Sequence, residues 1–153
     1  MENCCFIGHR FLAKKKRPII KKRLKATIEE LIQQGVTSFI CGGSFGFGLL
    51  AGCIVWGFKE KYEDIHLTML LPCQNQPQKW EQKDQEKYAR LLVAADEIIY
   101  VSEDFFEGCM NLRNMRMLEV SQYLVAYLKE TEPLVRVAKE MGLTVINLAD
   151  SGV

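Results

Sequence analysis

The chain has 153 residues, of which 48% are hydrophobic and 25% are charged, and its formal net charge is +1. This length predicts a single domain, residues 1–153, that is large enough to bury a core. The ordinary share of hydrophobic residues excludes a chain that is disordered throughout.

The first half of the chain alternates between strand-like and helix-like patterns. Apolar residues 4–7 predict a short strand that is buried on both faces. In the helix that follows, Pro18 suits the first turn and Gly35 suits the C-terminal stop. Residues 36–41 predict a second strand, which leads through a glycine-rich turn into a helix that ends near residue 61.

Residues 36–58 carry no charge and are numerous enough to span a bilayer. Four glycines stand in their middle, and each would weaken one continuous helix by roughly 1 kcal/mol. A strand, a turn and a helix therefore explain this stretch better than a membrane span, and no membrane partner is expected. The glycines are Gly42, Gly43, Gly46 and Gly48.

The second half repeats the same alternation. Thr131 is expected to cap the last helix, with Pro133 in its first turn and Gly142 at its stop, and the tail from Ala149 is expected to fray. Earlier helices are expected around 111–120 and around Trp80, Tyr88, Leu91, Leu92 and Ala95. Further strands are predicted at 65–71, 97–101, 123–128 and 143–148. This order predicts an α/β fold: a single Rossmann-like domain with a mainly parallel sheet and helices on both faces.

The six cysteines form no CxxC pair, and no histidine stands at zinc spacing from a pair of them. We therefore expect reduced thiols, no metal site and a cytoplasmic protein. The first ten residues also lack the apolar core of a secretion signal.

In open parallel sheets, ligands bind beyond the carboxyl ends of the strands. That rule selects the loops at 8–10, 42–48, 72–76 and 102–114. The glycines of 42–48 would let the backbone approach a phosphate, next to the positive end of a helix dipole. The spacing matches neither a P-loop nor GxGxxG, so a tight turn without a ligand is an equal alternative.

Arginines stand at two of these loops. Arg10 could bind a phosphate or carboxylate with two N–H groups, or could pair with an acid of a neighbouring helix. Arg113, Asn114 and Arg116 could reach into the same cleft, or the arginines could be exposed at an ordinary helix start. His9 could exchange protons near neutral pH, although a structural hydrogen bond is the alternative. Met110, Met115 and Met117 are expected in the core or the cleft lining.

A run of basic residues follows the first loop. It could attract phosphate, nucleic acid or an acidic partner, or it could be an exposed and solvated helix start. No aromatic residues are interleaved with it to stack on bases. The residues are Lys14, Lys15, Lys16, Arg17, Lys21, Lys22, Arg23 and Lys25.

Several short motifs occur in a fixed order. They are Cys-Cys-Phe-Ile-Gly-His-Arg at 4–10, the glycine loop at 42–48, Pro72-Cys73 with Gln76, Trp80, Asp84 and Tyr88, and residues 108–114. Together they resemble the YpsA-like branch of the SLOG superfamily, which also includes the LOG cytokinin-activating enzymes and the DNA-uptake protein DprA. The resemblance covers residues 4 to about 148.

The resemblance implies a Rossmann-like domain that senses a nucleotide-derived ligand. With the strand-end rule, it gives an expected set of ligand-binding residues and no catalytic residue or cofactor. The set is Gly8, His9, Arg10, Gly42, Gly43, Ser44, Gly46, Pro72, Arg113 and Asn114.

Two departures from this family pattern weaken the expected binding. Relatives carry an acidic residue where this chain has Gly48, and a Gly-Gly-Thr turn where it has 129–131, Lys-Glu-Thr, which brings Glu130 near any phosphate. The glycosidase motif of the LOG enzymes has no copy here. We therefore expect a nucleotide-binding or sensing protein rather than an efficient enzyme. The alternatives are nucleic-acid binding through residues 14–25 and a weak LOG-like N-glycosidic hydrolase. The oligomeric state is left open.

Overall fold

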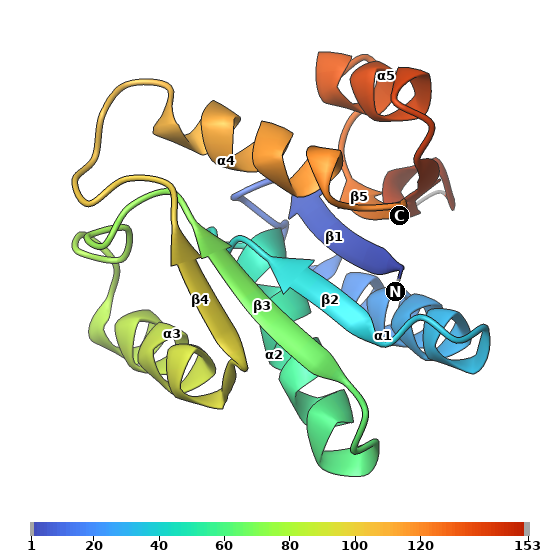
Figure 1. Ribbon diagram of the computed structural model, residues 1–153, viewed down its shortest axis with the longest axis horizontal. Helices are drawn as coiled ribbons and strands as arrows, with labels where there is room; N and C mark the ends of the chain where they lie inside the picture. The colour runs from blue at the N-terminus through green and yellow to red at the C-terminus, as the bar shows by residue number, and fades with distance from the viewer. Residues whose placement is uncertain (1, 152–153) are drawn as a thin grey trace.

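The fold is one six-stranded parallel sheet. In the computed structural model, which describes residues 2–151, the strand order is β4-β3-β2-β1-β5-β6, and every neighbouring pair is parallel (Figure 1). The strands are β1 (Asn3–Gly8), β2 (Ser38–Cys41), β3 (His66–Leu71), β4 (Glu97–Tyr100), β5 (Tyr123–Tyr127) and β6 (Thr144–Asn147). The predicted α/β Rossmann-like fold is confirmed.

Helices cover both faces of the sheet, and right-handed crossovers decide which face each one covers. The chain moves outward from β1 to β4, which places the first three helices on one face. It then returns across β1 to β5, which places the last two on the other face (Figure 1). The helices are α1 (Arg17–Gln33), α2 (Phe47–Lys61), α3 (Gln82–Ala94), α4 (Cys109–Glu119) and α5 (Pro133–Glu140).

Side chains that alternate along β1 supply both layers of the core. Cys4 and Phe6 pack in the layer under α1, α2 and α3, while Cys5 and Ile7 pack in the layer under α4 and α5. Because successive residues of a strand point to opposite faces, a strand buried on both sides must be apolar throughout. Phe6 stacks on Phe39 of β2 with ring centroids 6.0 Å apart. Each such buried side chain stabilises the fold by about 1.5–3 kcal/mol.

Some element ends differ from the sequence prediction. Trp80 and Ala95 flank α3 rather than belong to it. Glu132, not Thr131, precedes α5 at the N-cap position, and no side chain caps the helix there. The predicted fraying does not begin at Ala149: Leu148–Ser151 form a 3-10 helix, and the Asn147 side chain accepts a hydrogen bond from the Ala149 N–H. The rest of the tail, 152–153, lies outside the described residues.

The two predicted helix stops are confirmed. Gly35 and Gly142 follow their helices with positive φ angles of 98° and 92°, as C-terminal stops should. All six cysteines are free thiols. Within residues 2–151, no helix is long and apolar enough to cross a membrane.

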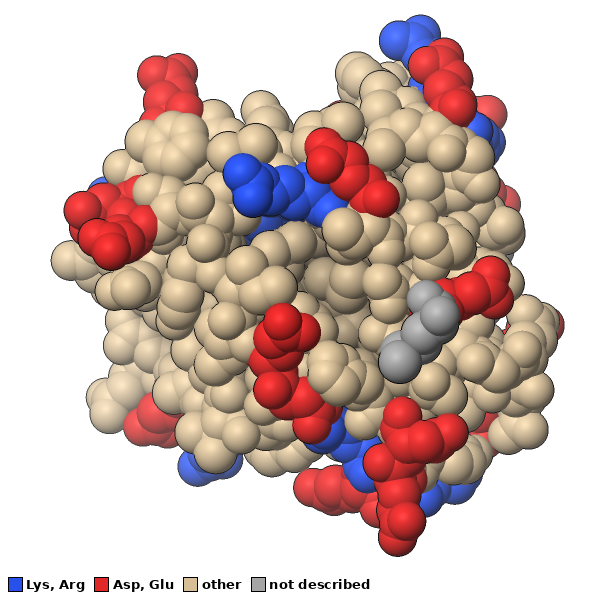
Figure 2. All heavy atoms as spheres, viewed as in Figure 1, with Lys and Arg blue, Asp and Glu red and all other residues tan. Residues whose placement is uncertain are grey.

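β4 forms one edge of the sheet and is exposed along its length, unlike the buried strands beside it. Ile98 and Ile99 are each 41% exposed, and Tyr100 is 38% exposed. The face of the molecule that carries α4 and α5 is largely uncharged, with acidic and basic groups scattered over it (Figure 2).

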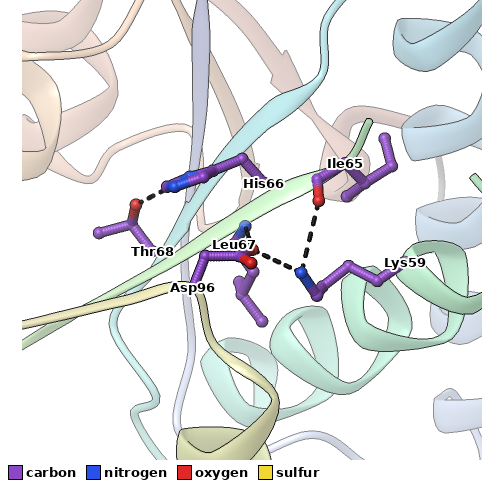
Figure 3. Close-up of polar contacts among 6 residues, drawn as sticks. All are labelled: Lys59, Ile65, His66, Leu67, Thr68 and Asp96. Atoms are coloured by element: carbon purple, nitrogen blue, oxygen red, sulfur yellow. Dashed lines mark hydrogen bonds and ion pairs between the residues drawn. The ribbon is translucent and has the colours of Figure 1, made fainter. Parts of the chain in front are cut away.

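An ion pair ties α2 to the amino ends of β3 and β4. The Lys59 ammonium donates to Asp96 Oδ2 at 2.5 Å, and the same oxygen accepts the Leu67 N–H at 2.8 Å (Figure 3). Burial by itself raises the pKa of the Asp96 carboxyl, but these two donors outweigh it and hold that pKa below its usual value. This cluster lies at the opposite end of the strands from the glycine loops.

Candidate functional site

A small cavity lies where β1 and β2 end, beside α4. Its volume is about 140 Å³. In doubly wound sheets, ligands bind in this place, at the carboxyl ends of strands near the point where the strand order reverses. Here the strand order reverses at β1, which has β2 on one side and β5 on the other. The lining residues are Phe6, Ile7, Gly8, Arg10, Gly42, Ser44, Gly48, Met110, Arg113, Asn114 and Met117.

Arg113 of α4 is the central polar side chain of the cavity and is only 4% exposed. Its guanidinium donates to the Gly42 carbonyl at 2.8 Å, to Ser44 Oγ at 2.6 Å and to Asn114 Oδ1 at 2.9 Å. All three acceptors are neutral. Among the ion pairs of residues 2–151, none involves Arg113. A buried positive charge therefore stands at the cavity without a carboxylate beside it.

Burial lowers the pKa of Arg113 to about 10, because the charged form loses its hydration. The guanidinium is still protonated at neutral pH. Buried charges are normally paired with an opposite charge. A buried guanidinium whose acceptors are neutral therefore favours the binding of an anion beside it.

Gly42 is held from two sides. Its carbonyl accepts the Arg113 hydrogen bond and a second one from Gln76 Nε2 at 3.2 Å. Gln76 also donates to the Tyr88 hydroxyl at 3.0 Å, which connects the turn to α3. A Cβ at Gly42 would come within 2.5 Å of Arg113 Nη1, so the guanidinium occupies the space that a side chain would fill.

α2 begins at the end of the same loop. Its N-cap residue, Gly46, has φ 82° and makes no side-chain hydrogen bond, so no side chain neutralises this helix end. A Cβ at Gly46 would collide with the backbone of Arg10, which is how the first and second loops pack together. The N-terminus of a helix favours negative charge through its unpaired N–H groups and its dipole.

The structure brings six of the ten predicted binding residues to the cavity lining: Gly8, Arg10, Gly42, Ser44, Arg113 and Asn114. The other four are not part of the lining. His9 packs edge-on against Tyr127 with ring centroids 5.9 Å apart, and Gly43 packs under Tyr88. Gly46 turns the chain into α2, and the Pro72 carbonyl accepts the Ser102 N–H.

The two departures from the family pattern have different consequences. Gly48 lines the cavity, so the missing carboxylate would have faced it. Glu130 is exposed and is not part of the cavity lining.

Sequence reasoning left the strand residues of the apolar wall out of the expected site. Phe6 and Ile7 lie just before the last residue of β1 and line the cavity. The strand-end rule could have included them. Met110 and Met117 of α4 also line the cavity, which agrees with the expectation that these methionines lie in the core or the cleft lining.

Comparisons with known proteins agree with this architecture. A sequence profile described as "YspA SLOG family" matches residues 10–141. A UPF0398 protein from Halalkalibacterium halodurans is 31% identical over 116 residues, which are 74% of this chain and 61% of that protein. A UPF0398 protein from Bacillus thuringiensis strain Al Hakam is 27% identical over 130 residues, which are 80% of this chain and 71% of that protein. The chain thus spans less than two thirds of the first of these relatives.

Two solved structures share the fold. DNA processing protein A (DprA) from Streptococcus pneumoniae has a TM-score of 0.66 at 10% identity, over 94% of this chain and 49% of that chain. DprA from Helicobacter pylori, whose structure concerns its single-stranded DNA binding mode, has a TM-score of 0.63 at 16% identity, over 94% and 63%. At these low sequence identities, the similarity shows a shared fold alone. From the profile match over most of its length, the chain belongs to the YpsA family of SLOG proteins.

Proposed function

We propose that this protein binds a phosphate-bearing, nucleotide-derived ligand in the cavity at the ends of β1 and β2. The observation that supports this is Arg113: it is 4% exposed, its acceptors are neutral, and it faces a cavity. A bound phosphate would supply the missing negative charge and accept further N–H bonds from the guanidinium, which has five donors.

Other groups of the lining suit the same ligand. Arg10 is exposed at the cavity and offers a second guanidinium. The Ser44 hydroxyl, which accepts a hydrogen bond from Arg113, keeps its own hydrogen free to donate. Gly8 and Gly42 also line the cavity, but Phe47 and the Arg113 guanidinium fill the space where their side chains would lie, so these glycines serve the packing of the wall.

The size of the cavity limits which part of a nucleotide it can enclose. About 140 Å³ corresponds to roughly four or five water-sized groups of ~30 Å³ each. That is room for a phosphoryl group and part of a sugar, so the base of a nucleotide would lie outside on the surface. The residues that line the cavity in the described chain include no Asp or Glu. Without a carboxylate to stabilise an oxocarbenium-like centre, the lining supports binding and sensing more than glycosidic hydrolysis.

Thermal unfolding tests the proposal. The protein would be titrated with pyrophosphate, AMP, ADP and ADP-ribose at fixed ionic strength. A ligand at a hundred times its Kd stabilises the fold by about 2.7 kcal/mol, which raises the Tm of a domain this size by roughly 5–10 °C. Arg113→Gln should abolish the rise, and Arg113→Lys should reduce it, because a lysine keeps the charge without the fork of donors.

Arg116→Gln is the matched control. Arg116 lies on the same helix, is exposed and is not part of the cavity lining, so its loss removes the same charge and should leave the Tm rise intact. If none of the four compounds raises the Tm, or if both variants lose the rise equally, the cavity is not the phosphate site.

A single-stranded nucleic acid is the second candidate ligand for the same cavity, since a phosphodiester offers the same oxygens. Its support is positional: Arg10 lies at the cavity, and exposed Lys14, Lys15 and Lys16 follow it in the chain. DprA from Helicobacter pylori, which shares the fold, is described by its single-stranded DNA binding mode. Affinity for an oligothymidylate that exceeds the affinity for ADP, falls steeply with salt and requires Lys14–Lys16 would favour this candidate.

A further inference from the structure

A second and larger concavity of about 1160 Å³ runs along α2, between α1 and α3. It lies on the face opposite α4, behind the strands in the view of Figure 1. Its lining shares no residue with the cavity at Arg113, so the two sites can be tested separately. We call it the α2 groove.

The floor of the α2 groove is uncharged and follows the spacing of a helix face. Leu50, Cys53 and Gly57 recur at three and four residues along α2, and all three line the groove. Leu50 and Cys53 are half-buried, and Gly57 is exposed. A Cβ at Gly57 would meet no atom within 4 Å, so the groove is open above it.

Basic side chains form both walls. On α1 they recur every four residues, at Arg17, Lys21 and Lys25, and on α3 they are Lys83, Lys87 and Arg90. With Lys61, the lining holds seven basic side chains against three acidic ones, Glu29, Asp84 and Glu86. Among the ion pairs of residues 2–151, only Lys61–Glu29, at 3.4 Å, joins two residues of the groove. Most of the positive charge is therefore unpaired.

Cys53 lies on the floor of the groove, on the helix that separates the two basic rows. Burial raises the pKa of its thiol, while the ammonium groups of Lys21 on α1 and Lys87 on α3 act on it from both sides in the opposite direction. Cys53 is thus a central position that is close to both rows of charge. The other five cysteines are buried, which makes Cys53 a selective probe of this groove.

We propose that the α2 groove binds an acidic amphipathic α-helix of a partner protein. The apolar face of such a helix would cover Leu50 and Cys53, and its backbone could approach closely over Gly57. Glutamates and aspartates on its two flanks would meet the basic rows of α1 and α3, which gives charge complementarity on both sides.

Two other occupants fit less well. Single-stranded nucleic acid binds through exposed aromatic faces. Three aromatic residues line the groove, and each is engaged within the fold: Phe58 is buried, Trp56 is half-buried against the core, and Phe45 packs edge-on against Trp80 with ring centroids 5.5 Å apart. A second copy of this chain that docked groove to groove would bring basic walls together and repel.

A designed peptide provides the probe. It would have 18 residues, leucines at i, i+3, i+4, i+7 and i+11, and glutamates along both flanks of that stripe; its matched control has lysines in place of the glutamates. The peptide with glutamates should slow alkylation of Cys53 in the full chain at least fivefold, and the peptide with lysines should not. Equal protection by both peptides, or by neither, would overturn the proposal.

Different variants test the floor and the basic walls of the α2 groove. Gly57→Leu fills the open space and improves the helix propensity, so it should fold and yet weaken binding of the labelled acidic peptide at least tenfold in fluorescence anisotropy. Lys21→Glu with Lys87→Glu should do the same. Lys15→Glu with Lys22→Glu changes the net charge equally outside the groove and should weaken binding less than threefold. Equal losses in the two charge pairs would mean a general charge effect and no groove.

The same protection experiment would identify either of the two other occupants. If a twenty-residue oligothymidylate protects Cys53 and the acidic peptide does not, the groove is a nucleic-acid site and the proposal is wrong. If Cys53 becomes protected as protein concentration rises, with dimers in sedimentation, the groove is a self-association surface and the proposal is again wrong. Tm shifts with ADP depend on Arg113 and should be unaffected by the groove variants.

Discussion

The guanidinium of Arg113 occupies the space in which a side chain of Gly42 would lie, while its Nη1 donates to the Gly42 carbonyl at 2.8 Å. Gly42 in a strand-end loop and Arg113 in a helix 71 residues later are therefore packed against each other. A side chain at position 42 would displace the guanidinium.

Gly42→Ala should displace Arg113 and weaken binding of ADP, or of whichever phosphate compound raises the Tm, at least tenfold. The added Cβ also overfills a packed site, which should cost about 1–3 kcal/mol of the free energy of unfolding. Urea unfolding and Tm titration measure the two effects. Unchanged affinity would show that the guanidinium can move aside without loss, which contradicts its proposed role.

Gly57→Ala should stabilise the protein, whereas Gly42→Ala should destabilise it. Gly57 lies in α2, where a Cβ meets nothing within 4 Å, and alanine is a better helix former. The free energy of unfolding should rise by up to about 1 kcal/mol and the Tm by about 2–4 °C. Ligand binding at the cavity should be unchanged. A fall in Tm would show that the helix needs glycine at this position.

The pH dependence of phosphate binding should follow two groups. A phosphate monoester gains its second charge near pH 6, so affinity should rise from pH 5 to pH 7. Burial lowers the pKa of Arg113 to about 10, so affinity should fall as the pH rises through about 10 and the guanidinium loses its charge. Isothermal titration at pH 5, 7, 9 and 10.5 measures both limbs. Arg113→Gln, which should not bind at any of these pH values, is the blank for both limbs.

Loss of charge at Arg113 acts in the opposite sense on the unliganded fold. Its pKa is lower in the folded chain than in the unfolded one, so the unfolded state binds more protons above pH 10. The contribution of Arg113 to the free energy of unfolding should therefore increase as the pH rises through this range, while ligand affinity falls. The two measurements distinguish a binding effect from denaturation.

Asp96→Asn should weaken the attachment of α2 to β3 and β4. The carboxylate accepts from Lys59 and from the Leu67 N–H, but its side chain is 37% exposed, so the expected loss is about 1 kcal/mol. Because the pKa of Asp96 is held below its usual value, this stabilisation is present above about pH 4 and is lost as the pH falls through the lowered pKa. Urea unfolding of both proteins at pH 7 and pH 3 should show a larger difference at pH 7 than at pH 3.

Much of the fold could be predicted because each element carries its own local signal. The buried strands are apolar runs, and Pro18, Gly35 and Gly142 mark helix ends through the φ angles they favour. Thr131 was misplaced by one residue because it and Glu132 both precede Pro133, and no side-chain hydrogen bond distinguishes the cap.

The site could be predicted only in part. The strand-end rule selects the right loops, but it does not say which residues of a loop face the ligand and which face the core, as His9 and Gly43 show. The contact of Gln76 with Gly42 joins residues 34 positions apart, and no local pattern encodes it. The basic row of α1 likewise lacks aromatic residues in the sequence, and the structure supplies the apolar floor from a different helix.

β4 leaves the N–H and C=O groups of one sheet edge without a neighbouring strand in residues 2–151. Such an edge can template the addition of strands from other molecules, which is how many proteins aggregate. Two features restrain this: the strand has four residues, and it begins with the charged Glu97. The short length of β4 and the carboxylate of Glu97 therefore limit how far this edge can pair with a strand of another molecule.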